Sequence, residues 1–308
     1  MPGVSLNTML PDISVVIPSL NRPEALKLAL ASVLSQDTGG KIAYEVIVVL
    51  DKKDRESQGW LEERVMPEGG FRLLRSGKQG VNSARNLGIG ESRAEIIYFL
   101  DDDCALAERA HLVNLYKSFG IYPKASAIGG GYLTDNDGSD IFRTSRNHAD
   151  NFYLEANSSA RGATLALLGG NTAYKKEIFL KYGYFDENIR FGAAETEFND
   201  RILKGGGELY FVRGLSVLHR AVKQGVGTYL IKSLLQGMGK SYSIGKNGRL
   251  RESYVKKQRG MWFLRIAGSL QVGTARKIIA AVFLFSTTLF YLWGLFLGSF
   301  LSRGTKKA

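Results

Sequence analysis

Apolar residues form short continuous runs over the first hundred positions, and segments with helical spacing separate these runs. The runs are rich in β-branched residues, which indicates strands buried on both faces. They lie at residues 12–17, 44–50, 71–74 and 96–100. This order of strands and helices predicts right-handed crossovers and a mostly parallel sheet with helices on both faces, an α/β fold.

The segments between these strands predict helices. Pro18 is expected to end the first strand, and Asn21 together with Pro23 marks a plausible helix start. Further helical spacing covers about residues 55–66, and another helix is expected to begin near Val81. Because ligands of such sheets bind beyond the carboxyl ends of the strands, residues that directly follow the strands are candidates for function.

The second half of the soluble part has a less regular pattern. Residues 127–133 predict a strand that bends at three glycines, and the glycine turn in "LLGGN" precedes a short strand and a helix. A further helix is expected from near Ala194 to the glycines at 205–207, and a last strand leads to His219.

Residues 278–301 form a run of 24 residues without a charge. At a helical rise of about 1.5 Å per residue, this run reaches about 36 Å, enough to cross a hydrocarbon core of about 30 Å. We therefore expect one transmembrane helix. Gly294 and Gly298 form a small-residue pair of the kind that supports a homodimer of membrane helices.

The net charge of +12 is unevenly distributed along the chain. Residues 1–219 carry 25 Lys and Arg against 28 Asp and Glu, whereas residues 220–308 carry 16 against 1. The basic segment before the apolar run favours contact with anionic membrane lipids and a single-pass topology in the cell membrane with residues 1–277 on the cytoplasmic side. The single cysteine, Cys104, excludes an internal disulfide, and no cleavable signal peptide is expected.

These features divide the chain into four expected parts, at residues 1–220, 221–277, 278–301 and 302–308. The first is the soluble domain, the second a basic membrane-interface segment, the third the span and the fourth a short basic tail.

Three adjacent carboxylates, Asp101 to Asp103, directly follow the buried strand at 96–100. Such carboxylates repel one another unless a cation neutralises them, and oxygen ligands select hard ions such as Mn²⁺ or Mg²⁺. A metal bound there could bridge a diphosphate and withdraw charge from it as a bond to it breaks.

Four stretches, in their order along the chain, resemble a family 2 glycosyltransferase with the GT-A fold. They are "SVVIPSLNRPEALKLALASVLSQ", "GVNSARNLGI", "YFLDDDC" and "GGNTAYKKEIFLKYGYFDENIRFGAAETEFNDRILKGGGELYFV", the last followed by "VLH". The resemblance covers about residues 12–220. It implies a Rossmann-like, mostly parallel sheet and an inverting, metal-dependent transfer of a sugar from a nucleotide-diphosphate donor.

The resemblance also implies roles for individual residues. Asp101 and Asp103 correspond to the family's Asp-x-Asp motif and would hold the metal, which His219 could complete. The residues expected to contact the nucleotide sugar are Pro18, Asn21, Asp51 near the base, Asp102 near the ribose and Arg85 near the diphosphate.

Transfer of this kind needs a base that takes the proton of the acceptor hydroxyl. The resemblance places this base in "AAETEFNDR", where Glu195 has the corresponding position relative to Arg201. Ala194 stands where the family has a second acid, so Glu197 remains an alternative. Its spacing to Arg201 is also that of an ordinary helix ion pair.

Two departures from the family pattern limit the prediction. Lys52 and Lys53 stand beside Asp51 in "LDKKD", so the nucleotide is uncertain, although a UDP-sugar is expected. Met261 in "QRGMW" stands where processive members have arginine, and one membrane helix cannot form a channel by itself. We therefore expect a single transfer to a lipid-linked or glycan acceptor rather than processive synthesis.

Two other classes of protein remain as alternatives. A membrane-tethered nucleotidyltransferase would need a glycine-rich basic loop after the first strand, and "IPSLNRPE" does not supply one. A non-enzymatic module that binds RNA or lipid headgroups leaves Asp101 to Asp103 and Glu195 without a role, so nucleic acid is not an expected partner.

Overall fold

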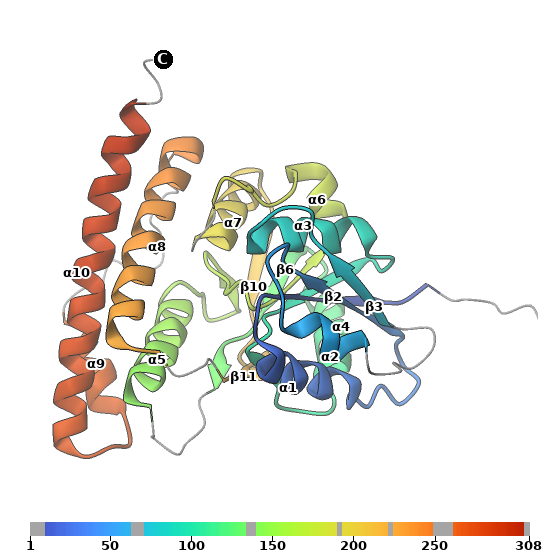
Figure 1. The fold of residues 1–308 in the computed structure, drawn as a ribbon, viewed down its shortest axis with the longest axis horizontal. Coiled ribbons are helices and arrows are strands. Elements are labelled where there is room, and N and C mark those ends of the chain that lie inside the picture. Colours follow the sequence, from blue (N-terminus) through green and yellow to red (C-terminus); the bar gives the residue numbers. More distant parts are fainter. Residues whose placement is uncertain are drawn as a thin grey trace, which may run out of the picture.

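A computed structural model describes residues 10–62, 71–133, 140–189, 193–220, 224–248 and 261–304 (Figure 1). The strands are β1 Ile13–Ser19, β2 Tyr44–Leu50, β3 Phe71–Arg75, β4 Ile96–Leu100, β5 Cys104–Leu106, β6 Ala125–Gly129, β7 Tyr132–Leu133, β8 Ala163–Thr164, β9 Asn171–Lys175, β10 Glu208–Phe211 and β11 Val217–His219. The helices are α1 Pro23–Leu34, α2 Ser57–Glu62, α3 Val81–Glu91, α4 His111–Ile121, α5 Ile141–Ala156, α6 Glu177–Tyr182, α7 Ala194–Lys204, α8 Val226–Asn247, α9 Trp262–Ser269 and α10 Thr274–Gly304, with a 3₁₀ turn at Arg213–Leu215.

Eight strands form the main sheet, in the order β3-β2-β1-β4-β9-β6-β10-β8. The first four strands are parallel, as the strand and helix order predicts, and β6 is parallel to β10. Strand β9 runs antiparallel to β4 and β6. A small second sheet, β5-β11-β7, brings the end of the soluble chain beside the residues that follow β4.

Helices cover both faces of the main sheet. Along β1, Val15 belongs to one apolar cluster and Val16 to the other, as the alternation of a strand requires. The first cluster includes Leu26 of α1 and Leu115 of α4, and the second includes helices α3, α6 and α7. Strands β1, β2 and β4 are thus buried on both faces, which confirms the prediction from their continuous apolar runs. Strand β3 departs from it, because β3 lies at the edge of the sheet and its residues are only half-buried or exposed.

Two local predictions about the first βα connection are wrong. Pro18 lies inside β1, beside Val49 of β2. Its missing N–H is tolerated because the pairing of β1 with β4 already ends at Val16. Helix α1 does begin at Pro23, but Asn21 does not cap it, because Asn21 has the left-handed φ of 50° and Arg22 occupies the cap position.

Helices α8 and α10 lie side by side and run in the same direction (Figure 1). A Cβ atom on Gly237 of α8 would lie 2.1 Å from the carbonyl oxygen of Tyr291, and one on Gly294 of α10 would lie 2.0 Å from that of Leu234. Gly298 is similarly close to Ser241. The small-residue face of α10 is therefore covered by α8 of the same chain, and the homodimer expected from Gly294 and Gly298 is not supported.

The opposite face of α10 is apolar and exposed. It carries Ile278, Val282, Phe285, Leu289, Leu292 and Phe296, each at least 46 % exposed. By length and composition, residues 274–300 could cross a membrane. The inner side of the same helix packs on the soluble part, because Phe283 and Leu284 share a buried cluster with Tyr229 of α8 and with α5 and α9.

Candidate active site

A cavity of about 2000 Å³ opens at the carboxyl ends of the parallel strands. Its walls come from the ends of β1, β2 and β4, the start of α3 and α7, and one side each of α5, α8 and α10. Asp101, Asp102, Asp103, Glu195 and His219 all line it. The sheet thus brings the predicted acids and the predicted histidine to one place, as its topology requires.

The three aspartates after β4 turn to different partners. Asp101 accepts a hydrogen bond from Arg85 at 3.0 Å. Asp102 is buried and accepts from Ser19 at 2.8 Å and from Arg22 at 3.0 Å, and Arg22 also contacts Asp103 at 3.0 Å. Burial raises the pKa of Asp102 to about 6, although Arg22 opposes this shift. Two arginines therefore offset much of the repulsion within the triad.

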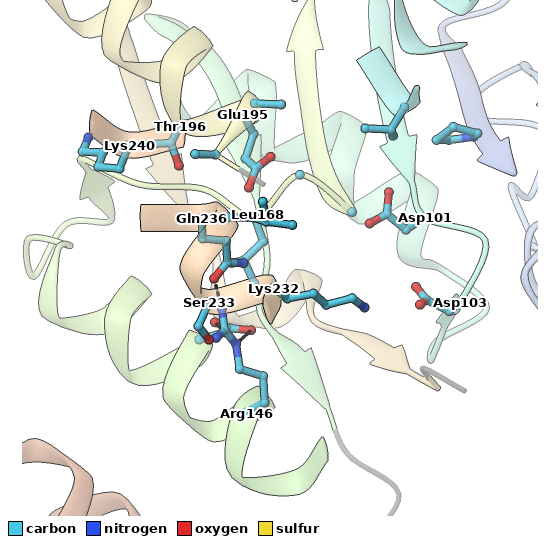
Figure 2. Close-up of a pocket in the computed structure, with 18 of the residues that line it drawn as sticks. Asp101, Asp103, Arg146, Leu168, Glu195, Thr196, Lys232, Ser233, Gln236 and Lys240 are labelled. Atoms are coloured by element: carbon cyan, nitrogen blue, oxygen red, sulfur yellow. Dashed lines mark hydrogen bonds and ion pairs between the residues drawn. The ribbon is translucent and has the colours of Figure 1, made fainter. Parts of the chain in front are cut away.

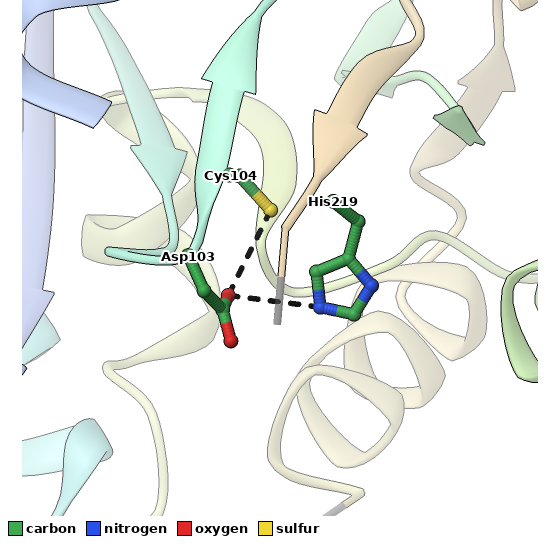
Figure 3. A group of neighbouring side chains, drawn as sticks. All are labelled: Asp103, Cys104 and His219. Atoms are coloured by element: carbon green, nitrogen blue, oxygen red, sulfur yellow. Dashed lines mark hydrogen bonds and ion pairs between the residues drawn. The ribbon is translucent and has the colours of Figure 1, made fainter. Parts of the chain in front are cut away.

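Asp103, Cys104 and His219 form a group that could hold a metal ion, with ligand atoms within 4.8 Å of one another (Figure 3). Antiparallel pairing of β11 with β5 places His219 opposite Cys104. The Nε2 atom of His219 lies 3.6 Å from Asp103 Oδ1. Asp101 is not in this group and pairs with Arg85 instead.

Asn147 of α5 fixes the orientation of the histidine ring. His219 Nδ1 lies 2.7 Å from the amide oxygen of Asn147. An amide oxygen can only accept, so Nδ1 carries the proton and Nε2 is left free to bind a metal. A carboxylate oxygen and an imidazole nitrogen fit Mn²⁺. Burial raises the pKa of the Cys104 thiol, which makes the sulfur a poor ligand.

Arg85 lies between Asp101 and Glu195. It is 3 % exposed, with its guanidinium against the rings of Phe99 and Phe185. Its distances are 3.0 Å to Asp101 and 3.9 Å to Glu195. Burial raises the pKa of Glu195, an effect that Arg85 partly offsets, and a raised pKa suits a carboxylate that accepts a proton.

The two glycines of "LLGGN" allow the chain to pass close to these acids. A Cβ atom on Gly170 would lie 2.4 Å from Asp101 Oδ2, and one on Gly169 would lie 2.9 Å from Glu195 Oε2. Any larger residue would displace a carboxylate. The glycine turn predicted from the sequence therefore has a direct role in shaping the site.

Glu197 has a different environment from Glu195. Its side chain is fully buried and forms two 2.8 Å hydrogen bonds with Arg201, and Lys246 lies 3.2 Å away. Glu197 does not line the cavity. These contacts are those of a structural ion pair that joins α7 to α8, and they favour Glu195 as the base.

The expected nucleotide side of the cavity contains Pro18 and Asp51. Asp51 is buried and accepts from the backbone N–H groups of Lys53 at 2.8 Å and Gly80 at 2.7 Å, which joins the end of β2 to the start of α3. Asn21 does not line the cavity, and its side-chain oxygen accepts from the N–H of Arg55. Its expected contact with the nucleotide is therefore not supported.

Sequence reasoning missed Arg22, Asn147 and Lys232, which also line the cavity. The sequence could have indicated Arg22, which directly precedes the helix that begins at Pro23. A cation at the start of a helix is unfavourable with the helix dipole unless an anion lies near it. Asn147 and Lys232 come from segments far along the chain, and nothing in the local pattern distinguishes them.

The family model for "Glycosyl transferase family 2" matches residues 14–183, more than half of the chain. The poly(ribitol-phosphate) β-N-acetylglucosaminyltransferase TarP of Staphylococcus aureus is 30 % identical over 130 residues, which are 42 % of this chain and 39 % of TarP. The minor teichoic acid biosynthesis protein GgaA of Bacillus subtilis is 25 % identical over 208 residues, which are 62 % of this chain and 43 % of GgaA. The chain thus spans less than half of the length of these relatives.

Two solved structures share the fold. A mannosyltransferase of Pyrobaculum calidifontis, solved with GDP-mannose and Mn²⁺, has a TM-score of 0.65 at 17 % identity over 95 % of this chain and 88 % of its own. GalNAc-T7, solved with UDP, GalNAc and Mn²⁺, has a TM-score of 0.55 at 18 % identity over 77 % of this chain and 50 % of its own. These similarities confirm the GT-A fold expected from the sequence.

Proposed function

Because the chain belongs to glycosyl transferase family 2, we propose that it transfers a sugar, with inversion, from a nucleotide-diphosphate donor to a hydroxyl group of a lipid-linked or glycan acceptor at a membrane. Residues 1–220 would form the catalytic domain. The expected donor is a UDP-sugar, although the two neighbours bind different nucleotides, GDP-mannose in one and UDP in the other.

One observation carries this proposal. The metal-binding group of Asp103 and His219 and the candidate base Glu195 line the same cavity, and buried Arg85 connects Asp101 to Glu195. With these assignments, the site for a diphosphate and the site for a hydroxyl group would be adjacent, which a single displacement requires.

In the proposed reaction, the acceptor oxygen forms a bond to the anomeric carbon as the bond from this carbon to the diphosphate oxygen breaks. Glu195 takes the proton of the acceptor hydroxyl, and the nucleoside diphosphate leaves. Arg85 would hold Glu195 in place, and Asp51 would accept from the base of the nucleotide. Asp103 and His219 would hold Mn²⁺ or Mg²⁺, which neutralises charge on the diphosphate when bound.

The membrane is part of the proposal. The exposed apolar face of α10 would anchor the chain, and the basic residues before it would contact anionic lipids with the catalytic domain on the cytoplasmic side. Part of this basic segment, residues 249–260, lies outside the described residues, as do the tail residues 305–308. Names of the relatives that refer to teichoic acid and poly(ribitol-phosphate) support an acceptor that carries phosphate.

Calorimetric titration of the detergent-solubilised full chain tests the donor site. UDP, GDP and dTDP are titrated with and without Mn²⁺, and Asp103→Asn is compared with Asp37→Asn, whose aspartate does not line the cavity. We expect one nucleotide to bind in a Mn²⁺-dependent way, with binding lost in Asp103→Asn and kept in Asp37→Asn. Absence of binding by all three nucleotides would refute the proposed function.

A further inference from the structure

The cavity continues beyond the catalytic acids into a space between α5 and α8 that reaches α10. Its volume of about 2000 Å³ exceeds the roughly 300–1000 Å³ of a typical ligand pocket. There is thus room for a second ligand beside a nucleotide sugar. We call this space the distal subsite, defined by Arg146 and Asn147 of α5 and Tyr229, Lys232 and Ser233 of α8.

Two cations reach the distal subsite. Figure 2 shows Arg146 beside Ser233 and Gln236, and Lys232 extending from α8 toward Asp103. Arg146 is held by Asp150 at 3.1 Å and Gln236 at 2.9 Å. Lys232 donates to neutral Gln224 at 2.9 Å. Each cation is therefore positioned and keeps further N–H groups for a ligand.

Three buried polar groups in the same walls have no hydrogen-bond partner among the described residues. They are the amide nitrogen of Asn147, the hydroxyl of Tyr229 and the hydroxyl of Ser233, on side chains at most 7 % exposed. Buried polar groups are nearly always hydrogen-bonded, so unpaired ones that line a cavity point to a ligand. All three can donate, and together with two cations they suit the oxygens of phosphate groups.

The wall nearest the membrane helix is different in character. Tyr291 and Leu292 of α10 and Trp262 of α9 line this end of the cavity. Leu292 is also 53 % exposed and belongs to the outer apolar row of α10, beside Leu289 and Phe296. The cavity wall is therefore continuous with the apolar surface of α10, so a ligand with an anionic head and an apolar chain fits both parts.

We propose that the distal subsite binds the diphosphate of a lipid-linked sugar acceptor. Arg146, Lys232 and the unpaired donors of Asn147, Tyr229 and Ser233 hold the phosphate oxygens, and the lipid chain leaves along α10. The acceptor sugar then extends from the subsite toward Glu195. This inference rests on the proposed transferase function and names the class of its acceptor.

Binding of farnesyl diphosphate to the full chain in phosphatidylcholine nanodiscs tests the inference. The measurement is made with EDTA, so that a diphosphate cannot bind through a metal at Asp103. Inorganic pyrophosphate and farnesol are the matched probes for head and chain alone. We expect farnesyl diphosphate to bind at least about tenfold more tightly than either probe, and the double variant Arg146→Gln, Lys232→Gln to lose about tenfold or more.

Two further variants separate a binding role from a structural role. Tyr229→Phe and Ser233→Ala remove hydroxyls that have no described partner, so we expect unchanged thermal midpoints and about threefold to tenfold weaker binding of farnesyl diphosphate. Lys41→Gln combined with Lys181→Gln removes the same charge at exposed sites away from the cavity and should leave binding unchanged.

Three results would overturn the inference. The first two are equal affinities for farnesyl diphosphate and farnesol, and binding that the variants do not change. The third is measured with Mn²⁺ in place of EDTA: loss of farnesyl diphosphate binding on saturation with the nucleotide identified by calorimetry, which would place the diphosphate in the donor site. Failure of the proposed function gives a different result, because in that case no nucleotide binds to the wild-type chain in the calorimetric titration.

Discussion

At the scale of single residues, the site depends on how several carboxylates are kept ionised and apart. Arg22 contacts Asp102 and Asp103, and Arg85 lies between Asp101 and Glu195. Each arginine thus pairs with two acids. Removal of one arginine would leave two acids uncompensated, which is costly where the groups are buried.

The candidate base, Glu195, is the first residue to test. Glu195→Gln keeps the shape of the side chain and removes its ability to take a proton, so we expect hydrolysis or transfer of the donor sugar to fall by about 10²–10⁴-fold. Nucleotide binding should remain, because Glu195 does not belong to the metal-binding group. The measurement is turnover of the nucleotide sugar identified by calorimetry.

Glu197→Gln is the matched comparison on the same helix. This substitution removes the negative charge that pairs with Arg201 and Lys246. We therefore expect a lower thermal midpoint and little change in the turnover rate per folded molecule. If Glu197→Gln abolishes turnover at an unchanged midpoint while Glu195→Gln keeps its rate, the assignment of the base is reversed.

His111 gives the fold a dependence on pH. The ring is 2 % exposed and lies 3.2 Å from the hydroxyl of Tyr98, and burial lowers its pKa to about 4. The unfolded chain, with an ordinary pKa near 6.5, binds this proton first as the pH falls. The contribution of neutral His111 to the free energy of unfolding is therefore complete above about pH 6.5. It is lost as the pH falls toward 4, and the loss is on the order of 3 kcal/mol.

Thermal or urea unfolding at pH 7 and pH 5 measures this effect. The wild type should be less stable at pH 5, and His111→Gln should show a smaller difference between the two conditions. An identical pH dependence of both proteins would exclude His111 as the source.

At the scale of elements, the sequence predicted the strands well and their surroundings less well. Continuous β-branched runs identify β1, β2 and β4 because a strand buried on both faces needs apolar residues at every position. The antiparallel insertion of β9 between β4 and β6 was not predicted, because it depends on pairing between distant segments. The motif residues of the site were predictable because they follow strands in local sequence patterns. Asn147 and Lys232 were not, because only the packing of distant segments brings them to the cavity.

The contact between α8 and α10 is a property of elements that a single substitution can test. Gly237→Ala places a methyl group where the backbone of Tyr291 lies 2.1 Å away, so we expect a loss of about 1–3 kcal/mol of stability. Gly227→Ala on the same helix meets nothing within 4 Å and should be neutral or stabilising through helix propensity. Equal thermal midpoints for the two variants in detergent would contradict the close approach.

At the scale of the whole molecule, the soluble part and the apolar helix share a core. Ala280, Phe283 and Leu284 of α10 are at most 3 % exposed and pack among residues of α5, α8 and α9. The boundary expected at residue 277 therefore divides the chain in sequence but cuts through a packed cluster. A protein that ends there would expose this cluster to solvent.

Membrane binding should accordingly be tested by substitution rather than by truncation. Val282→Ser with Leu289→Ser changes exposed positions of α10, so we expect weaker flotation with liposomes at an unchanged thermal midpoint. Residues 1–277 alone should instead show a lower midpoint or aggregation. Full liposome binding by the double serine variant would show that this face does not contact lipid.

The glycines Gly237 and Gly294 let α8 and α10 approach closely, so α10 cannot be exchanged without a change at this contact. Because Tyr291 and Leu292 of α10 line the cavity that holds Glu195, the helix that could cross a membrane is also part of the wall of the candidate site. The chain is therefore not modular at this boundary. A chimera with an unrelated apolar helix of equal length would still carry a helix suited to a bilayer, but it would lose the part of the cavity wall that the proposed distal subsite uses.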